Sequence, residues 1–245
     1  MMKYEQELGI FQIMNLLQYL QALDPDIAAS NPYMALESQR LKTLKLVNCE
    51  LESHAIPTVV FSSLKNLEEL EVSSTNVKVI FAIMEADMKG YTLRLKKMTL
   101  ENLPNLIRVW DKDREGILSF QNLQEVLVTN CEKLKTLFPT ELAKRVVKLE
   151  KLEIRNCEKL QQIVDQEANA ITEEPTEFSF PHLTSLILHM LPRLSCFYPG
   201  RFTLECPDLN HLEVLSCDKL ETFQNQQEAQ CSTSVTRLPL FSEGK

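Results

Sequence analysis

The chain has 245 residues, of which 44% are hydrophobic and 24% charged, and these proportions are ordinary for a soluble globular protein. Its formal net charge of −8 argues against nucleic acid or an anionic membrane as the main partner, because both require a basic surface. No segment is long and apolar enough to span a bilayer, and the acidic N-terminus makes a poor signal peptide. We therefore expect a cytoplasmic protein, with the nucleus as the alternative compartment.

Residues 1–40 precede the first clear repeat. Their apolar residues recur at helical spacing between Ile10 and Leu20, which predicts a helix from about Gln6 to Leu23 that ends before Pro25. We favour an N-terminal helical cap or partial repeat that covers the open end of a repeat stack. A dimerising helix is the alternative.

Seven later segments share one pattern of apolar residues. They begin at Leu41, Leu67, Leu95, Leu123, Leu149, Leu183 and Leu209, and their fourth and sixth positions are all aliphatic or Met. The starting points lie 26 or 28 residues apart, with one gap of 34, and the alternation predicts one half-buried strand per unit. The expected fold is an α/β leucine-rich-repeat solenoid over residues 41–234. This curved horseshoe would have about seven repeats, a parallel β-sheet on its concave face, and helices and turns on its convex face.

A second apolar set follows each predicted strand. In the last five repeats it falls at position twelve, as Leu106, Leu134, Leu160, Leu194 and Leu220. The first two repeats carry Glu52 and Lys78 there, with Leu51 and Val77 one place early, so we expect local irregularity. Aromatic residues three places before Leu123 and Leu183 lead into those repeats, as Phe120 and Phe180.

Three segments stand apart from the repeat pattern. Residues 139–149 predict a helix on the convex side with Thr140 as its N-cap. Residues 165–178 form an acidic insertion, interpreted as a solvated loop or, alternatively, as a docking loop for a basic partner. The tail at 235–245 resembles the start of a truncated further repeat.

Four of the seven cysteines occupy position nine of their repeats, namely Cys49, Cys131, Cys157 and Cys217. Metal or redox chemistry requires thiols that converge, whereas these are dispersed one per repeat. We therefore expect buried structural cysteines in a reducing compartment.

No phosphate-binding loop, HExxH or GxSxG pattern occurs in the chain. His189 and His211 can approach each other from adjacent strands, yet no acidic partner is evident from spacing. We therefore expect no catalytic, cofactor-binding or metal-binding residues.

The remaining candidate site is the concave strand face, formed by the third, fifth and seventh positions. We place Leu127, Ile187 and Leu215 in its central row, and such outward apolar residues are either incidental or mark a contact site. Charge substitutions at these three positions are expected to abolish partner binding without unfolding the stack. The candidate protein-binding residues are Lys97, Thr99, Leu127, Thr129, Lys151, Glu153, Arg155, Ile187, His189, His211 and Leu215.

Specific phrases carry a family resemblance. These are CEKLKTLFP at 131–139, LEKLEIRNCEKLQQIV at 149–164, the acidic insertion, and FPHLTSLILHMLPRL at 180–194. Together with the position-nine cysteine, they resemble the leucine-rich-repeat region of plant disease resistance proteins of the coiled-coil, nucleotide-binding, leucine-rich-repeat class.

The resemblance implies a non-catalytic recognition module in plant innate immunity. Its implied partners are a pathogen effector, a guarded host protein or the receptor's own nucleotide-binding domain. The ADP or ATP site of that family lies in a domain that this sequence lacks, so no cofactor is expected here. The alternative is the substrate-recognition subunit of an F-box ubiquitin ligase, although Cys131, Cys157 and Cys217 are followed by E-K-L or D-K-L and not by the x-x-I-T-D usual there.

Overall fold

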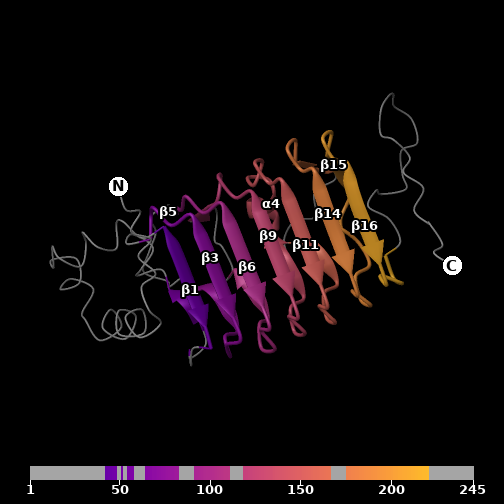
Figure 1. Cartoon of the computed structure of the whole chain (residues 1–245). Helices are drawn as coiled ribbons and strands as arrows, with labels where there is room; N and C mark the ends of the chain where they lie inside the picture. Colours follow the sequence, from indigo (N-terminus) through magenta and orange to yellow (C-terminus); the bar gives the residue numbers. More distant parts are fainter. Residues whose placement is uncertain are drawn as a thin grey trace, which may run out of the picture.

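The computed structural model describes residues 42–48, 51, 54–57, 64–82, 91–110, 118–166 and 175–220. Its main feature is a parallel sheet of seven strands that lie side by side in chain order (Figure 1). The strands are β1 (Thr43–Val47), β3 (Glu69–Ser73), β6 (Lys97–Glu101), β9 (Glu125–Thr129), β11 (Lys151–Arg155), β14 (Ser185–His189) and β16 (His211–Leu215). The predicted solenoid of parallel strands is therefore confirmed.

The register joins equivalent positions of successive repeats. Leu44 pairs with Leu70, for example, and Leu152 pairs with both Val126 and Leu186. Because side chains alternate between the two faces of a strand, positions four and six of every repeat point to the same side. They are buried in the first six strands, and each contributes roughly 1.5–3 kcal/mol by leaving water.

Outside the seven-stranded sheet, short strands in the described part of the chain pair in parallel in four small sheets. They are β2 (His54–Pro57), β4 (Val79–Ala82) and β7 (Arg108–Trp110); β10 (Thr136–Pro139) and β12 (Gln162–Asp165); β13 (Thr176–Ser179) and β15 (Phe202–Glu205); and β5 (Tyr91–Thr92) and β8 (Leu118–Ser119). Within the described ranges, the only helix is α4 (Thr140–Ala143). The described residues thus contain little helix, and short strands occupy places where helices and turns were expected.

The helix predicted over 139–149 shrinks to the four residues of α4. Thr140 is not its N-cap: Pro139 occupies that place, and the Thr140 hydroxyl donates instead to the Asp165 carbonyl of β12. The rest of the segment continues through turns in which Val146 and Leu149 are buried. The hydroxyl therefore joins two neighbouring repeats and does not start a helix.

The apolar residues after each strand complete the core. Four of the predicted position-twelve leucines, from Leu106 to Leu194, are fully buried, and Leu220 packs partly against the core. In the second repeat Val77 is buried one place early, so the expected irregularity is confirmed there. The two aromatic lead-ins are confirmed as well, since Phe120 and Phe180 are both buried.

The boundary predicted for the acidic insertion was too wide at both ends. Asp165 belongs to β12, and Phe178 belongs to β13, where its ring packs against Phe197, Tyr198 and Phe202. Phe178 is buried, so it contributes to the core and not to a solvated loop. Residues 167–174, the predicted cap at 1–40 and the predicted tail at 235–245 lie outside the described residues.

Candidate functional site

The candidate site is the side of the seven-stranded sheet that carries positions three, five and seven, here called the open face. Because equivalent positions of neighbouring strands pair with each other, these positions form three rows across the sheet. The fifth-position row runs Lys45, Glu71, Thr99, Leu127, Glu153, Ile187 and Glu213. The placement of Leu215 in this central row was wrong, because Leu215 pairs with His189 in the seventh-position row.

The first half of the open face carries ion pairs between neighbouring strands. Lys45 Nζ lies 3.4 Å from Glu71 Oε2, and Lys97 Nζ lies 3.2 Å from Glu125 Oε2. All four side chains are well exposed, so each pair contributes at most about 1 kcal/mol. Beyond them, Thr99, Leu127 and Thr129 are partly buried on β6 and β9.

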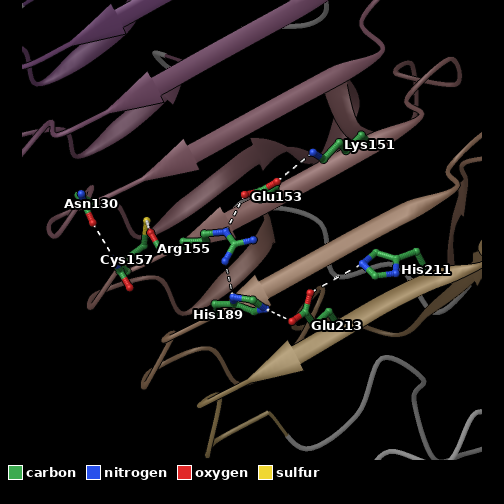
Figure 2. Close-up of polar contacts among 9 residues, drawn as sticks. Asn130, Lys151, Glu153, Arg155, Cys157, His189, His211 and Glu213 are labelled. Atoms are coloured by element: carbon green, nitrogen blue, oxygen red, sulfur yellow. Dashed lines mark hydrogen bonds and ion pairs between the residues drawn. The ribbon is translucent and has the colours of Figure 1, made fainter.

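The second half carries a continuous polar chain across β11, β14 and β16 (Figure 2). Lys151 Nζ and Arg155 Nε lie 3.1 and 2.6 Å from the two oxygens of Glu153. The next link joins Arg155 Nη1 to His189 Nδ1 at 2.6 Å. This brings together four predicted site residues from two repeats.

The polar chain continues through an acidic residue that the sequence analysis missed. Glu213 lies between the two histidines, with Oε1 at 3.1 Å from His189 Nε2 and Oε2 at 3.7 Å from His211 Nε2. No acidic partner was evident from the spacing of these histidines, but the structure places one between them. Counting Glu213 as the fifth position of the last repeat would have found it. We call Lys151, Glu153, Arg155, His189, Glu213 and His211 the six-residue network.

The contact with Arg155 determines which ring nitrogen of His189 acts as the acceptor. A guanidinium can only donate hydrogen bonds, so His189 Nδ1 must accept and must carry no hydrogen. The ring hydrogen of neutral His189 then lies on Nε2, the nitrogen that faces Glu213. The contacts therefore lead from Arg155 on β11 through His189 on β14 to Glu213 on β16, and His211 approaches Glu213 from its other side.

Glu153 is the most buried carboxylate of the network, with its side chain only 14% exposed. Burial raises the pKa of Glu153, but hydrogen bonds from Arg155 and Lys151 outweigh burial, so its pKa lies below the ordinary value. Glu153 is therefore a fixed negative charge at neutral pH, and it holds two cationic side chains in place.

Ile187 lies at the centre of the network and is only 7% exposed. Ile187 pairs with Glu153 and Glu213 on the adjacent strands. Its neighbours on the same face of β14 are Ser185 and His189. It is not part of the main core cluster, so the polar side chains of the open face cover it. The expected charge substitution at Ile187 is thus no clean test of binding, because a buried charge costs stability. Leu215, by contrast, is 51% exposed.

The edge where the strands end carries a feature with no counterpart in the sequence analysis. All seven position-eight residues have positive φ values, between 52° and 57°. The amide side chains of three of them form a ladder, in which Asn156 Nδ2 donates to Asn130 Oδ1 at 2.8 Å and Asn130 Nδ2 donates to Asn102 Oδ1 at 2.7 Å. Four asparagines at one repeat position were the available signal, because Asn tolerates the left-handed region.

The position-nine cysteines lie behind this edge. Cys131 and Cys157 are fully buried, and each thiol donates to the position-seven carbonyl of its own repeat. The adjacent Cys157 thiol and burial raise the pKa of Cys131. The predicted structural role is confirmed for these two, whereas Cys217 is partly exposed and Cys49 lies outside the described residues. Among the residues that the structure describes, no group of three or more His, Cys, Asp or Glu side chains is placed to hold a metal ion.

One parallel strand per repeat, aliphatic positions four and six, and a left-handed residue at position eight together define a leucine-rich-repeat protein. A family model described as "Plant disease resistance protein RPS2-like, leucine-rich repeats" matches residues 26–158 and 146–231. The chain belongs to this family. Comparison with curated proteins and with solved structures gave no match.

Family membership gives the chain a protein-interaction role in plant disease resistance, and solenoids of this kind are typically non-catalytic. Within the described ranges, no helix has the length and apolar character needed to cross a membrane.

Proposed function

We propose that the open face over β9, β11, β14 and β16 recognises a protein partner in the plant defence response. The partner is a pathogen effector, a guarded host protein or the nucleotide-binding domain of a resistance receptor. The proposal places this recognition in the cytoplasm and requires no cofactor bound to this chain. The observation that carries it is the six-residue network, which holds long polar side chains in fixed positions on a solvent-facing sheet.

Pre-organised side chains favour binding, because ordering a long side chain at an interface costs about 0.5–1.5 kcal/mol. Arg155 is held at two nitrogen atoms and Glu153 at both oxygens. These side chains are therefore already ordered, and the free energy needed to order them on binding is small. Partly buried Leu127 lies on one side of the network and exposed Leu215 on the other. Arginine is enriched among the energetically important residues of interfaces, and apolar neighbours such as these help to exclude water from it.

The test is affinity capture from plant extract, with healthy and infected tissue compared by quantitative mass spectrometry. The bait is the whole chain, either wild type or carrying Leu127→Lys with Leu215→Lys. The matched control carries Ile107→Lys with Val147→Lys, since these exposed apolar residues lie outside the strands of the open face. We expect a receptor nucleotide-binding domain or a pathogen protein to be captured by wild type and control and lost with the open-face variant.

Equal capture by both variants would contradict the proposal. Recovery of a Skp1-like adaptor by wild type would favour the ubiquitin-ligase alternative instead. Circular dichroism of each bait establishes that any loss of capture does not follow from unfolding.

A further inference from the structure

A second surface lies at the edge where the arrowheads of the seven strands end in Figure 1. An open groove of about 370 Å³ runs there across the ends of β9, β11, β14 and β16. It shares Asn130 and Glu132 with a second depression of about 420 Å³ that extends toward the end of β3. The groove is lined by positions eight and ten of the repeats, so its residues are separate from those of the open face.

The groove combines carboxylates with an apolar patch. Glu132, Glu158 and Asp218 line it at position ten of their repeats, and Met190 and Pro192 lie between Glu158 and Asp218 in repeat order. Met190 is 58% exposed, the highest value among the large hydrophobic residues of the described chain that are exposed. A long apolar side chain in such a position is available to cover the aliphatic stem of a ligand residue.

The three carboxylates have no cationic partner in the part of the chain that the structure describes. Basic residues follow them in sequence, but none of these lines the groove. Lys133, for example, is directed to a neighbouring repeat, where its Nζ donates to Asn105 Oδ1 at 2.7 Å. Among the described residues, therefore, no cation neutralises the negative charge of the groove.

The asparagine ladder supplies one further acceptor. Asn102 and Asn130 each accept a hydrogen bond from the amide of the next repeat. Asn156 is followed at this position by Met190, which has no donor, so the ladder stops there. The side-chain oxygen Oδ1 of Asn156 therefore lies next to a residue whose side chain cannot donate a hydrogen bond to it. Asn156 and Met190 both line the groove.

From this combination we infer that the groove binds an extended peptide segment with Lys or Arg at alternate positions. Cationic groups would pair with the three carboxylates, while their aliphatic stems would lie on Met190 and Pro192. A peptide donor would complete the ladder at Asn156. Unlike the proposed function, this inference does not depend on the open face.

The spacing of the groove fits such a segment. Strands in a sheet lie about 4.8 Å apart, so the three repeat steps from Glu132 to Asp218 span about 14 Å. In an extended peptide, residues i and i+4 lie about 14 Å apart and point to the same side as i+2. Three alternate cationic residues therefore span the length of the carboxylate row, and the middle one lies about 2 Å beyond Glu158, within reach of a long side chain.

The test uses fluorescence anisotropy with a fluorescein-labelled Lys-Ala-Lys-Ala-Lys peptide and the whole chain. The groove variant carries Glu132→Gln, Glu158→Gln and Asp218→Asn. The matched control carries Glu177→Gln, Glu205→Gln and Asp208→Asn, three exposed acids elsewhere, so both variants lose the same net charge. We expect about tenfold weaker binding by the groove variant, since three partly exposed ion pairs each worth a factor of two to three multiply.

A second variant, Met190→Lys, leaves every carboxylate in place and puts a cation at an exposed position in the groove. It should weaken peptide binding by a similar factor, which keeps the test valid if the triple variant fails to fold. If the groove variant and the control variant lose the same amount of peptide affinity, the peptide is attracted by overall charge and the inference is wrong. The absence of binding by wild type at millimolar peptide would also overturn it. Leu215→Lys should leave peptide affinity unchanged whether or not the open face binds its own partner.

Discussion

Met190 occupies a backbone conformation that suits asparagine better than methionine. Its φ of 53° lies in the left-handed region, where a side chain that cannot bond locally costs roughly 1–2 kcal/mol. Met190→Asn should relieve most of this cost and allow the new amide to donate to Asn156, as Asn156 donates to Asn130. An exposed hydrogen bond adds about 0.5 kcal/mol. We therefore expect a net stabilisation of about 1–2 kcal/mol, or a rise in Tm of about 2–8 °C.

Urea and thermal unfolding, followed by circular dichroism, measure this change. Met190→Ala is the control that keeps the left-handed strain and adds no donor, and its expected midpoint is close to that of wild type. Asn130→Ala is the opposite case, because it removes two ladder bonds and places alanine at a φ of 57°, so it should cost about 2–3 kcal/mol. A Met190→Asn midpoint at or below that of wild type would refute the account of this edge.

Three further outcomes are expected. Cys131 and Cys157 should resist iodoacetamide in the native chain and react after unfolding, because both are buried and only thiolates are nucleophilic; mass spectrometry showing native labelling at the rate of the less buried Cys196 would contradict this. Hydrogen bonds from Lys42 and Lys96 lower the pKa of Glu68 from 4.5 to about 2, so their stabilisation is present above about pH 4.5 and lost as pH falls toward 2. Glu68→Gln should flatten the fall of the urea midpoint over that range, and an unchanged slope would argue against the ion pairs. Hydrogen exchange measured by mass spectrometry should be faster in β16 than in β11, because Leu212 and Val214 are only partly buried; equal protection would show that the last repeat is covered.

Core positions were predictable from the sequence because buried positions require apolar residues, which recur at a fixed spacing. Positions four and six must be apolar in every repeat, and this requirement alone determined the strands and their register. Segments such as Thr136–Pro139 and Gln162–Asp165 were not predicted as strands, since runs of four residues cannot be separated from turns or helix starts by periodicity.

The left-handed backbone conformation at position eight was harder to predict from residue type than the buried positions were. This conformation is met by Asn in four repeats, by Ser in two and by Met190 in one, so no single residue type marks it. Main-chain hydrogen bonds hold the conformation even where the side chain is unfavourable, as in the bond from the Met190 amide to the Leu215 carbonyl at 2.8 Å. Tertiary pairing therefore overrides local preference at this residue.

The exposure of the open face could not be read from one repeat. Alternation correctly places Ile187 on that face, but its burial results from side chains on β11 and β16. Those strands are distant in sequence and adjacent in space, because each solenoid repeat packs on its neighbours. The combination of side chains in three consecutive repeats, and not the residue type at one position, decides what a partner meets.

This dependence on neighbouring repeats also separates the two proposed surfaces. The left-handed residue at position eight turns the chain away from the strand, so position ten lines the groove while positions three, five and seven stay on the open face. Glu158 lines the groove and is not paired with any residue of the six-residue network. Glu153 belongs to that network and does not line the groove. Each surface can therefore change its partner by substitutions a few residues apart in one repeat, while the buried positions four, six, nine and twelve preserve the same stack.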